Sequence, residues 1–188
     1  GYLIAKGDSA NVASVIKDLK CPVSTFGISE NCNWQAINIS YNDMGFGTFD
    51  VLYNGENFGH FQLSVPGFHN IINSLSAIAC AHYLGISIST IKDSLTLYKG
   101  THRRFELKGK IKDISVIDDY AHHPTEITAT LRAAKRYPHK KMWCVFQPHT
   151  YTRTITLLEE FSSAFESTDE IIIADIYAAR EKDTGLIH

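Results

Sequence analysis

Nine consecutive residues in the second half of the chain carry a dense set of groups able to do chemistry. They read Asp118-Asp-Tyr-Ala-His-His-Pro-Thr-Glu126 and combine carboxylates, a tyrosine hydroxyl and two imidazoles. Such groups bind substrates through hydrogen bonds, and imidazole also exchanges protons near neutral pH. The preceding residues 114–117 read Ile-Ser-Val-Ile and predict a strand. We therefore interpret residues 118–126 as an active-site loop at a strand end.

Two further polar loops follow predicted strands in the same half of the chain. Residues 147–154 read Gln-Pro-His-Thr-Tyr-Thr-Arg-Thr, and residues 175–181 read Asp-Ile-Tyr-Ala-Ala-Arg-Glu. The short apolar strands alternate with predicted helices, which indicates βαβ units and a parallel sheet; the strands are 114–117, 142–146 and 171–174, and the helices 124–137 and 153–165. Ligands bind beyond the carboxyl ends of such strands. We therefore expect the three loops to face one crevice.

The first loop has structural alternatives. Asp118 and Asp119 could simply cap the helix predicted to begin at Pro124. His122 and His123 could form a metal pair, but adjacent side chains point in different directions and metal sites use spaced ligands. We therefore predict no metal site here. One imidazole is expected to bind substrate while the other packs.

The second loop contains an arginine in an unfavourable place. Arg153 opens a predicted helix, where a cation opposes the helix dipole. A bound anion would offset that position, so we predict that Arg153 contacts an anionic ligand. Tyr151 and Tyr177 either take part in the site or cover apolar surface.

A second cluster lies in the middle of the chain. Gly67-Phe-His-Asn-Ile-Ile-Asn73 places Asn70 and Asn73 three residues apart, on one face of a helix turn. Two carboxamides suit the edge of a purine base, although Asn70 could cap the helix and Asn73 could be merely solvated. Arg103-Arg104-Phe-Glu106 lies in a predicted linker, where a guanidinium could reach a phosphate.

The first hundred residues predict a different arrangement from the rest. Strands at 2–5 and 22–26 flank a helix of about residues 9–19, and residues 34–65 alternate as an antiparallel meander with a hairpin at Asn54-Gly55. Helices at 69–84 and 87–98 follow. The pattern changes between about residues 100 and 107, so we predict an α/β protein with domains 1–106 and 107–188.

Bulk properties exclude several classes of protein. The 188 residues are 44% hydrophobic with a formal charge of −2, which does not suit a general nucleic-acid binder. No apolar run approaches the roughly 20 residues of a membrane span, and no signal peptide is visible. Cys80 and Cys144 lie in apolar runs and are expected to be buried free thiols in the cytoplasm, with a Cys21–Cys32 disulfide as the alternative. Both ends of the sequence look truncated, so we expect the chain to be a fragment of a longer protein.

The motifs together resemble the Mur ligases, the ATP-dependent amino-acid ligases of peptidoglycan synthesis. The resemblance rests on Gly67-x-His-Asn-x-x-Asn73, Lys99-Gly-x-x-Arg-Arg-Phe-Glu106, Asp118-Asp-Tyr-Ala-His-His-Pro-Thr-Glu126 and Gln147-Pro-His-x-Tyr-Thr-Arg-Thr154, in the family's order and spacing. It covers nearly the whole chain. Within the family, the His-His-Pro-Thr-Glu form is that of the member that joins L-alanine to UDP-N-acetylmuramate.

The resemblance implies a fold and a reaction. Residues 1–106 would be the back part of a central ATPase-type domain, and residues 107–188 a truncated, Rossmann-like domain with a parallel sheet. The muramoyl carboxylate would attack ATP to give an acyl phosphate, which the alanine amine then attacks, with Mg²⁺ neutralising charge. No Gly-x-x-x-x-Gly-Lys-Ser/Thr phosphate loop is present, so the phosphate cradle and most magnesium ligands are expected outside this chain.

The resemblance also implies roles for single residues. The nucleotide would be bound by His69, Asn70, Asn73, Arg104 and Asp119, with the first three near adenine, Arg104 at the phosphates and Asp119 at the ribose. Tyr120, His122, His149 and Arg153 would line the alanine and acyl-phosphate site, and Arg104, His122 and Arg153 would be the catalytic set. Thr150 stands where the family often has arginine, which puts one phosphate contact in doubt.

Two other functions remain open from the sequence. A ligase that recycles murein tripeptide shares the His-His-Pro-Thr pattern. A noncatalytic module that binds a nucleotide or phosphosugar would use Arg104 and Arg153 for affinity only. The fragment alone is expected to be inactive, and exposed apolar surface would favour its self-association.

Overall fold

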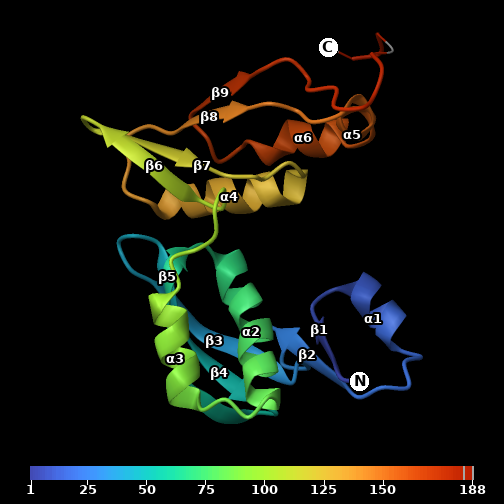
Figure 1. The fold of residues 1–188 in the computed structure, drawn as a ribbon, viewed down its shortest axis with the longest axis vertical. Helices are drawn as coiled ribbons and strands as arrows, with labels where there is room; N and C mark the ends of the chain where they lie inside the picture. The colour runs from blue at the N-terminus through green and yellow to red at the C-terminus, as the bar shows by residue number, and fades with distance from the viewer. Residues whose placement is uncertain (184, 188) are drawn as a thin grey trace. The chain divides into compact units, whose positions relative to one another are not determined.

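The structure, a computed structural model, describes residues 1–183 and 185–187. The chain divides into two compact units, Gly1–Lys99 and Gly100–His188 (Figure 1). Each unit has a hydrophobic core of its own, and each is described separately below.

The first unit is built on a five-stranded sheet in the order β1-β2-β3-β4-β5. β1 and β2 pair in parallel, as do β2 and β3, whereas β3, β4 and β5 form the antiparallel meander expected from the alternating pattern. Three helices complete the unit. The bounds are β1 Leu3–Lys6, α1 Ala10–Ile16, β2 Val23–Gly27, β3 Trp34–Tyr41, β4 Phe46–Tyr53, β5 Glu56–Pro66, α2 Phe68–Tyr83 and α3 Ile88–Leu97.

The turn between β4 and β5 confirms the predicted hairpin. Asn54 and Gly55 have φ angles of 51° and 83°, so both central residues are left-handed. That combination defines the turn whose twist matches two paired strands, and Asn-Gly adopts it at the lowest steric cost.

Helix α2 packs against the sheet and closes the core of this unit. Phe49, Phe61, Ile71, Leu75 and Ile78 are among its fully buried side chains. The close approach depends on a glycine in β4, because a Cβ at position 47 would lie 2.6 Å from a side-chain carbon of Ile71. The burial of these side chains holds the first two turns of α2, which carry Asn70 and Asn73, in a fixed place.

Helix α2 also explains one wrong prediction about the cysteines. Cys80 lies in an apolar run but is exposed, because Ile78 and Ala79 occupy the buried face of the helix. Cys144 is partly buried, and burial raises the pKa of its thiol. Cys21 and Cys32 are both free thiols, so the alternative disulfide does not form.

The second unit contains two separate two-stranded sheets. β8 (Trp143–Phe146) and β9 (Glu170–Ile173) pair in parallel, as the βαβ pattern predicts. β7 (Ile114–Asp118) instead pairs antiparallel with β6 (Glu106–Ile111), a strand that the sequence analysis did not predict. Residues 106–111 read Glu-Leu-Lys-Gly-Lys-Ile, in which charged residues and a glycine hide the apolar alternation.

The helices of the second unit differ from expectation at one place. Helix α4 (Pro124–Arg136) begins at the predicted proline. The single helix predicted for residues 153–165 is two helices, α5 (Tyr151–Thr156) and α6 (Leu158–Ala164), which meet at Leu157. β-Branched residues fill most of α5, and their restricted side-chain rotation lowers helix propensity.

The core of the second unit is small. It gathers buried residues of α4, β8 and α6, namely Ile127, Leu131, Phe146, Phe161 and Ala164. Large apolar side chains of β8 and β9 remain exposed, among them Trp143 at 58%, Val145 at 73% and Ile173 at 61%.

In the described part of the chain, no helix is long and apolar enough to cross a membrane.

Candidate functional site

The Asp119 carboxylate fixes the loop that follows β7. Its Oδ2 accepts a hydrogen bond of 2.8 Å from the backbone N–H of Phe105, and its Oδ1 accepts one of 2.7 Å from the N–H of Ala121. The chain before β6 and the loop after β7 are therefore joined through one side chain. Asp119 thus stabilises the loop rather than capping α4, whose cap is the His123 imidazole, which accepts from the N–H of Thr125.

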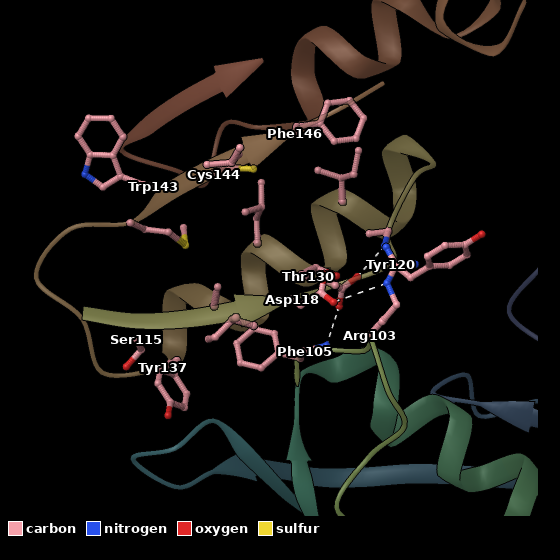
Figure 2. Close-up of a pocket in the computed structure, with 18 of the residues that line it drawn as sticks. Arg103, Phe105, Ser115, Asp118, Tyr120, Thr130, Tyr137, Trp143, Cys144 and Phe146 are labelled. Carbon is pink, nitrogen blue, oxygen red and sulfur yellow. Dashed lines mark hydrogen bonds and ion pairs between the residues drawn. The ribbon is translucent and has the colours of Figure 1, made fainter. Parts of the chain in front are cut away.

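Arg103 adds a second connection between the same two segments. Its carbonyl accepts a 2.7 Å hydrogen bond from the N–H of Tyr120, and its Nε lies 3.5 Å from a carboxylate oxygen of Asp118. The guanidinium carbon lies 4.9 Å from the centre of the Tyr120 ring (Figure 2). Arg103 and Phe105 both have left-handed φ angles, 57° and 48°. Two such residues near each other are strained, and the surrounding hydrogen bonds hold them there.

Glu126 connects two of the predicted site residues. One carboxylate oxygen lies 3.6 Å from a terminal nitrogen of Arg104, and the other accepts a 3.2 Å hydrogen bond from the N–H of His122 and lies 3.6 Å from His122 Nδ1. Burial raises the pKa of Glu126, but the His122 N–H, the nearby imidazole and Arg104 outweigh it, so the pKa lies below its usual value. Glu126 is the residue that the sequence analysis missed; its place three residues after the helix cap was the available signal.

The loops after β8 and β9 are joined to each other. His149 and Tyr177 form a parallel bridge, in which the N–H of Thr150 donates to the Tyr177 carbonyl at 2.9 Å. Their rings lie 5.5 Å apart. Thr150 has a φ of 69°, a costly conformation for a β-branched residue. The bridge therefore holds a strained turn immediately before α5.

Arg153 lies on α5 and is half-buried. Glu181 accepts hydrogen bonds of 2.8 and 2.6 Å from the N–H and hydroxyl of Thr152, so a carboxylate already offsets the dipole at this helix start. The Thr152 hydroxyl and N–H hold the pKa of Glu181 below its usual value. This contact weakens the dipole argument for an anion at Arg153. Among the described residues, however, the Arg153 guanidinium forms no ion pair, so it can still bind an external anion.

The three loops line one open cavity of about 1240 Å³ in the second unit. Its polar residues include Tyr120 and His122 from the first loop, His149 and Arg153 from the second and Tyr177 from the third. Its lining also includes apolar side chains such as Ile117, Leu131 and Phe146. Figure 2 shows Tyr120 and Arg103 at the end away from Trp143. The lining therefore provides hydrogen-bonding groups and a cation together with apolar side chains. Arg104 does not line this cavity.

The predicted adenine contacts lie in the first unit. Gly67, with a φ of 98°, precedes α2, and the Asn70 amide donates a 2.8 Å hydrogen bond to the Pro66 carbonyl. That bond ties the helix to the end of β5, but it is not a helix cap, because the cap residue is Gly67 and no side chain bonds a helix N–H group there. Asn73 is exposed and His69 is half-buried.

No group of three or more histidine, cysteine or carboxylate side chains that could hold a metal ion occurs among the residues that the structure describes. The carboxylates of the first loop are engaged by backbone N–H groups and arginines instead.

Comparison with known proteins gives the family. The model of the Mur ligase middle domain matches residues 1–81, and that of the Mur ligase glutamate ligase domain matches residues 103–185. The two matches follow each other along the chain, one in each structural unit. The chain belongs to the Mur ligase family.

Individual relatives agree with this assignment. The chain is 57% identical over 187 residues to the UDP-N-acetylmuramate–L-alanine ligase of Clostridium acetobutylicum and 51% identical to that of Caldanaerobacter subterraneus. Both alignments cover 100% of this chain and 41% of the relative, so the chain spans about two-fifths of their length.

Solved structures show the same fold. The UDP-N-acetylmuramate–alanine ligase of Thermotoga maritima matches with a TM-score of 0.75 at 29% identity, covering 93% of this chain and 37% of that one. A murein peptide ligase of Psychrobacter arcticus matches with a TM-score of 0.59 at 26% identity, covering 93% and 43%.

Replacing Asp119 should loosen the first loop. In Asp119→Asn the amide oxygen can accept only one of the two N–H groups, and the NH₂ group faces the other. We expect the free energy of unfolding to fall by about 1–3 kcal/mol. Urea denaturation measures this, and amide hydrogen exchange at Phe105 and Ala121 should speed up in the variant.

Asp113→Asn is the matched control, because Asp113 is an exposed carboxylate in the β6–β7 turn. It should leave both measurements unchanged. Equal stability of Asp119→Asn and the native chain would show that Asp119 does not hold the loop.

Proposed function

We propose that the protein containing this chain joins L-alanine to UDP-N-acetylmuramate with ATP, in the cytoplasm, during peptidoglycan synthesis. The observation that carries the proposal is identity above 50%, along the whole chain, to relatives with that named activity. The carboxylate of the muramoyl group attacks the terminal phosphate of ATP and becomes an acyl phosphate. The amine of L-alanine then displaces phosphate and forms the amide.

In this proposal five residues have nucleotide-binding roles. Asn73 offers an exposed amide, Asn70 keeps its carbonyl oxygen for the adenine amino group, and His69 lies beside them. Arg104, half exposed and held by Glu126, supplies a guanidinium for phosphate oxygens, which it can contact through two parallel hydrogen bonds. Asp119 has two carboxylate oxygens with further lone pairs, so it can accept from ribose hydroxyls while keeping its backbone bonds.

ATP in such reactions carries Mg²⁺, which neutralises the phosphate charge. The described residues hold no assembled group of metal ligands, so we assign no magnesium ligand in this chain. The residues' own contribution is to bind and orient the phosphates through Arg104.

The amino acid and the acyl phosphate occupy the cavity in the second unit. Arg153 forms no ion pair among the described residues and suits the alanine carboxylate or a phosphate oxygen. Tyr120, His122 and His149 line the same cavity and provide hydrogen bonds around it. Arg104, His122 and Arg153 are the residues that we propose to act on the reacting groups.

A second candidate is ligation of a peptide in place of L-alanine. The observation that favours it is the similarity to the Psychrobacter arcticus murein peptide ligase, which also covers 93% of this chain. A noncatalytic module that binds a nucleotide or phosphosugar is a third candidate, and it would show binding without turnover.

The full-length protein separates these candidates in one assay. ADP formation should require UDP-N-acetylmuramate and L-alanine together, because the acyl phosphate needs the amine to turn over. The tripeptide of murein recycling should not replace L-alanine. Faster ADP formation with the tripeptide would favour the recycling ligase, and binding of ATP without any ADP would favour the noncatalytic module.

We also propose that the 188-residue chain associates with itself through the exposed apolar residues of β8 and β9, including Val145 and Ile173. Unpaired strand edges with apolar side chains favour association. Size-exclusion chromatography should show species larger than the 21.1 kDa monomer, and Val145→Lys should shift them toward it. A monomer at all concentrations would contradict this.

A further inference from the structure

The His122 imidazole is held in one orientation by its own loop. Its Nδ1 lies 2.9 Å from the backbone carbonyl oxygen of Tyr120. A carbonyl oxygen can only accept a hydrogen bond, so Nδ1 must carry the hydrogen. In a neutral imidazole the other nitrogen then has a free lone pair. The loop therefore presents His122 with Nε2 as a proton acceptor.

Glu126 supports the same orientation. Its carboxylate lies 3.6 Å from His122 Nδ1 and accepts from the backbone N–H of the same residue. A negative charge beside Nδ1 favours the hydrogen on that atom, and it stabilises an imidazolium once Nε2 has taken up a proton. The Tyr120 ring packs against the imidazole, with ring centres 5.1 Å apart and planes at 70°. Three contacts from two residues thus determine the position and tautomer of one side chain.

The cavity that His122 lines is the one in which we place the amino-acid substrate. His122 lines the same cavity as Arg153, to which we assigned the carboxylate of the amino acid. In an α-amino acid the ammonium group is attached to the carbon next to the carboxylate, so it must lie near the groups that surround Arg153. Near neutral pH the amine of a free amino acid is protonated. A protonated nitrogen has no lone pair and cannot attack an acyl carbon.

We propose that His122 is the general base that deprotonates the incoming amino acid, with Glu126 as its positioning residue; this rests on the proposed function. His122 Nε2 takes one proton from the ammonium group. The nitrogen lone pair then forms the C–N bond at the acyl carbon, and the C–O bond to phosphate breaks. The second proton leaves the nitrogen with the departing phosphate, and the third remains on the amide.

A purely structural role for Glu126 is the alternative. Glu126 is the third residue of α4, where a glutamate bonds the backbone N–H at the helix cap, and glutamine does the same. Glu126→Gln therefore keeps the cap but removes the charge beside His122. His122→Asn keeps an N–H donor near the Tyr120 carbonyl but removes Nε2. The two variants separate proton transfer from folding.

The experiment uses the full-length protein and two nucleophiles. L-alanine must lose a proton before it attacks the acyl phosphate, whereas hydroxylamine is largely unprotonated at neutral pH and traps the acyl phosphate as a hydroxamate. In His122→Asn we expect alanine ligation to fall by about 100-fold or more while hydroxamate formation is kept, since a general base contributes on that scale. Glu126→Gln should show a smaller loss of the same selectivity.

His102→Asn is the matched control, because His102 Nδ1 lies 3.4 Å from the carboxylate of Glu106 four residues later, as His122 lies near Glu126, but His102 does not line the cavity. It should leave both rates unchanged. Equal loss of alanine and hydroxylamine reactions in both test variants, or no loss in either, would overturn the role of His122. A native protein that forms neither alanine product nor hydroxamate would instead overturn the proposed function itself.

Discussion

The bidentate contact of the Asp119 carboxylate with two backbone N–H groups is the constraint on which the candidate site depends. It joins the segment before β6 to the loop after β7, so that the neighbouring Arg104 has a fixed place within the second unit. Arg103 and Phe105 could not keep left-handed φ angles without such contacts. With these two segments joined, the Glu126 carboxylate lies within 3.6 Å of both Arg104 and His122. Carboxylates therefore organise the site before any ligand binds.

The same logic applies at the other strand ends. Glu181 satisfies the first turn of α5, and the bridge between His149 and Tyr177 holds the two loops together. The three arginines near these loops differ in whether a carboxylate pairs with them. Arg103 and Arg104 are engaged by carboxylates, whereas Arg153 forms no ion pair among the described residues. Preorganised charges of this kind stabilise developing charge without rearranging during the reaction.

Local sequence signals predicted much of this arrangement. Asn54-Gly55 determines a hairpin by its own backbone preference, and Pro124 marks the start of α4, so both could be read directly. The three polar loops were selected because ligands bind at strand ends in parallel sheets; β8 and β9 do pair in parallel, whereas β7 does not. Strand β6 was missed, because lysines and a glycine there conceal its alternation. Its pairing with β7 depends on tertiary contacts that no short window contains.

The roles of the acidic residues were harder to predict. Asp119 looked like a possible helix cap, but its partners lie two and fourteen residues away, and only the folded chain brings Phe105 to it. Glu126 was not selected as a site residue, because its significance comes from two neighbours rather than from its own position. The tautomer of His122 similarly depends on a carbonyl two residues before it.

The most direct test of this account is the tautomer of His122 itself. The ¹⁵N chemical shifts of its two ring nitrogens can be measured by NMR in the 188-residue chain, at a pH where the imidazole is neutral. The account predicts hydrogen on Nδ1 and a free lone pair on Nε2, because the Tyr120 carbonyl and Glu126 both lie on the Nδ1 side. A spectrum with hydrogen on Nε2 would contradict the orientation of the loop, and with it the proposed proton acceptor.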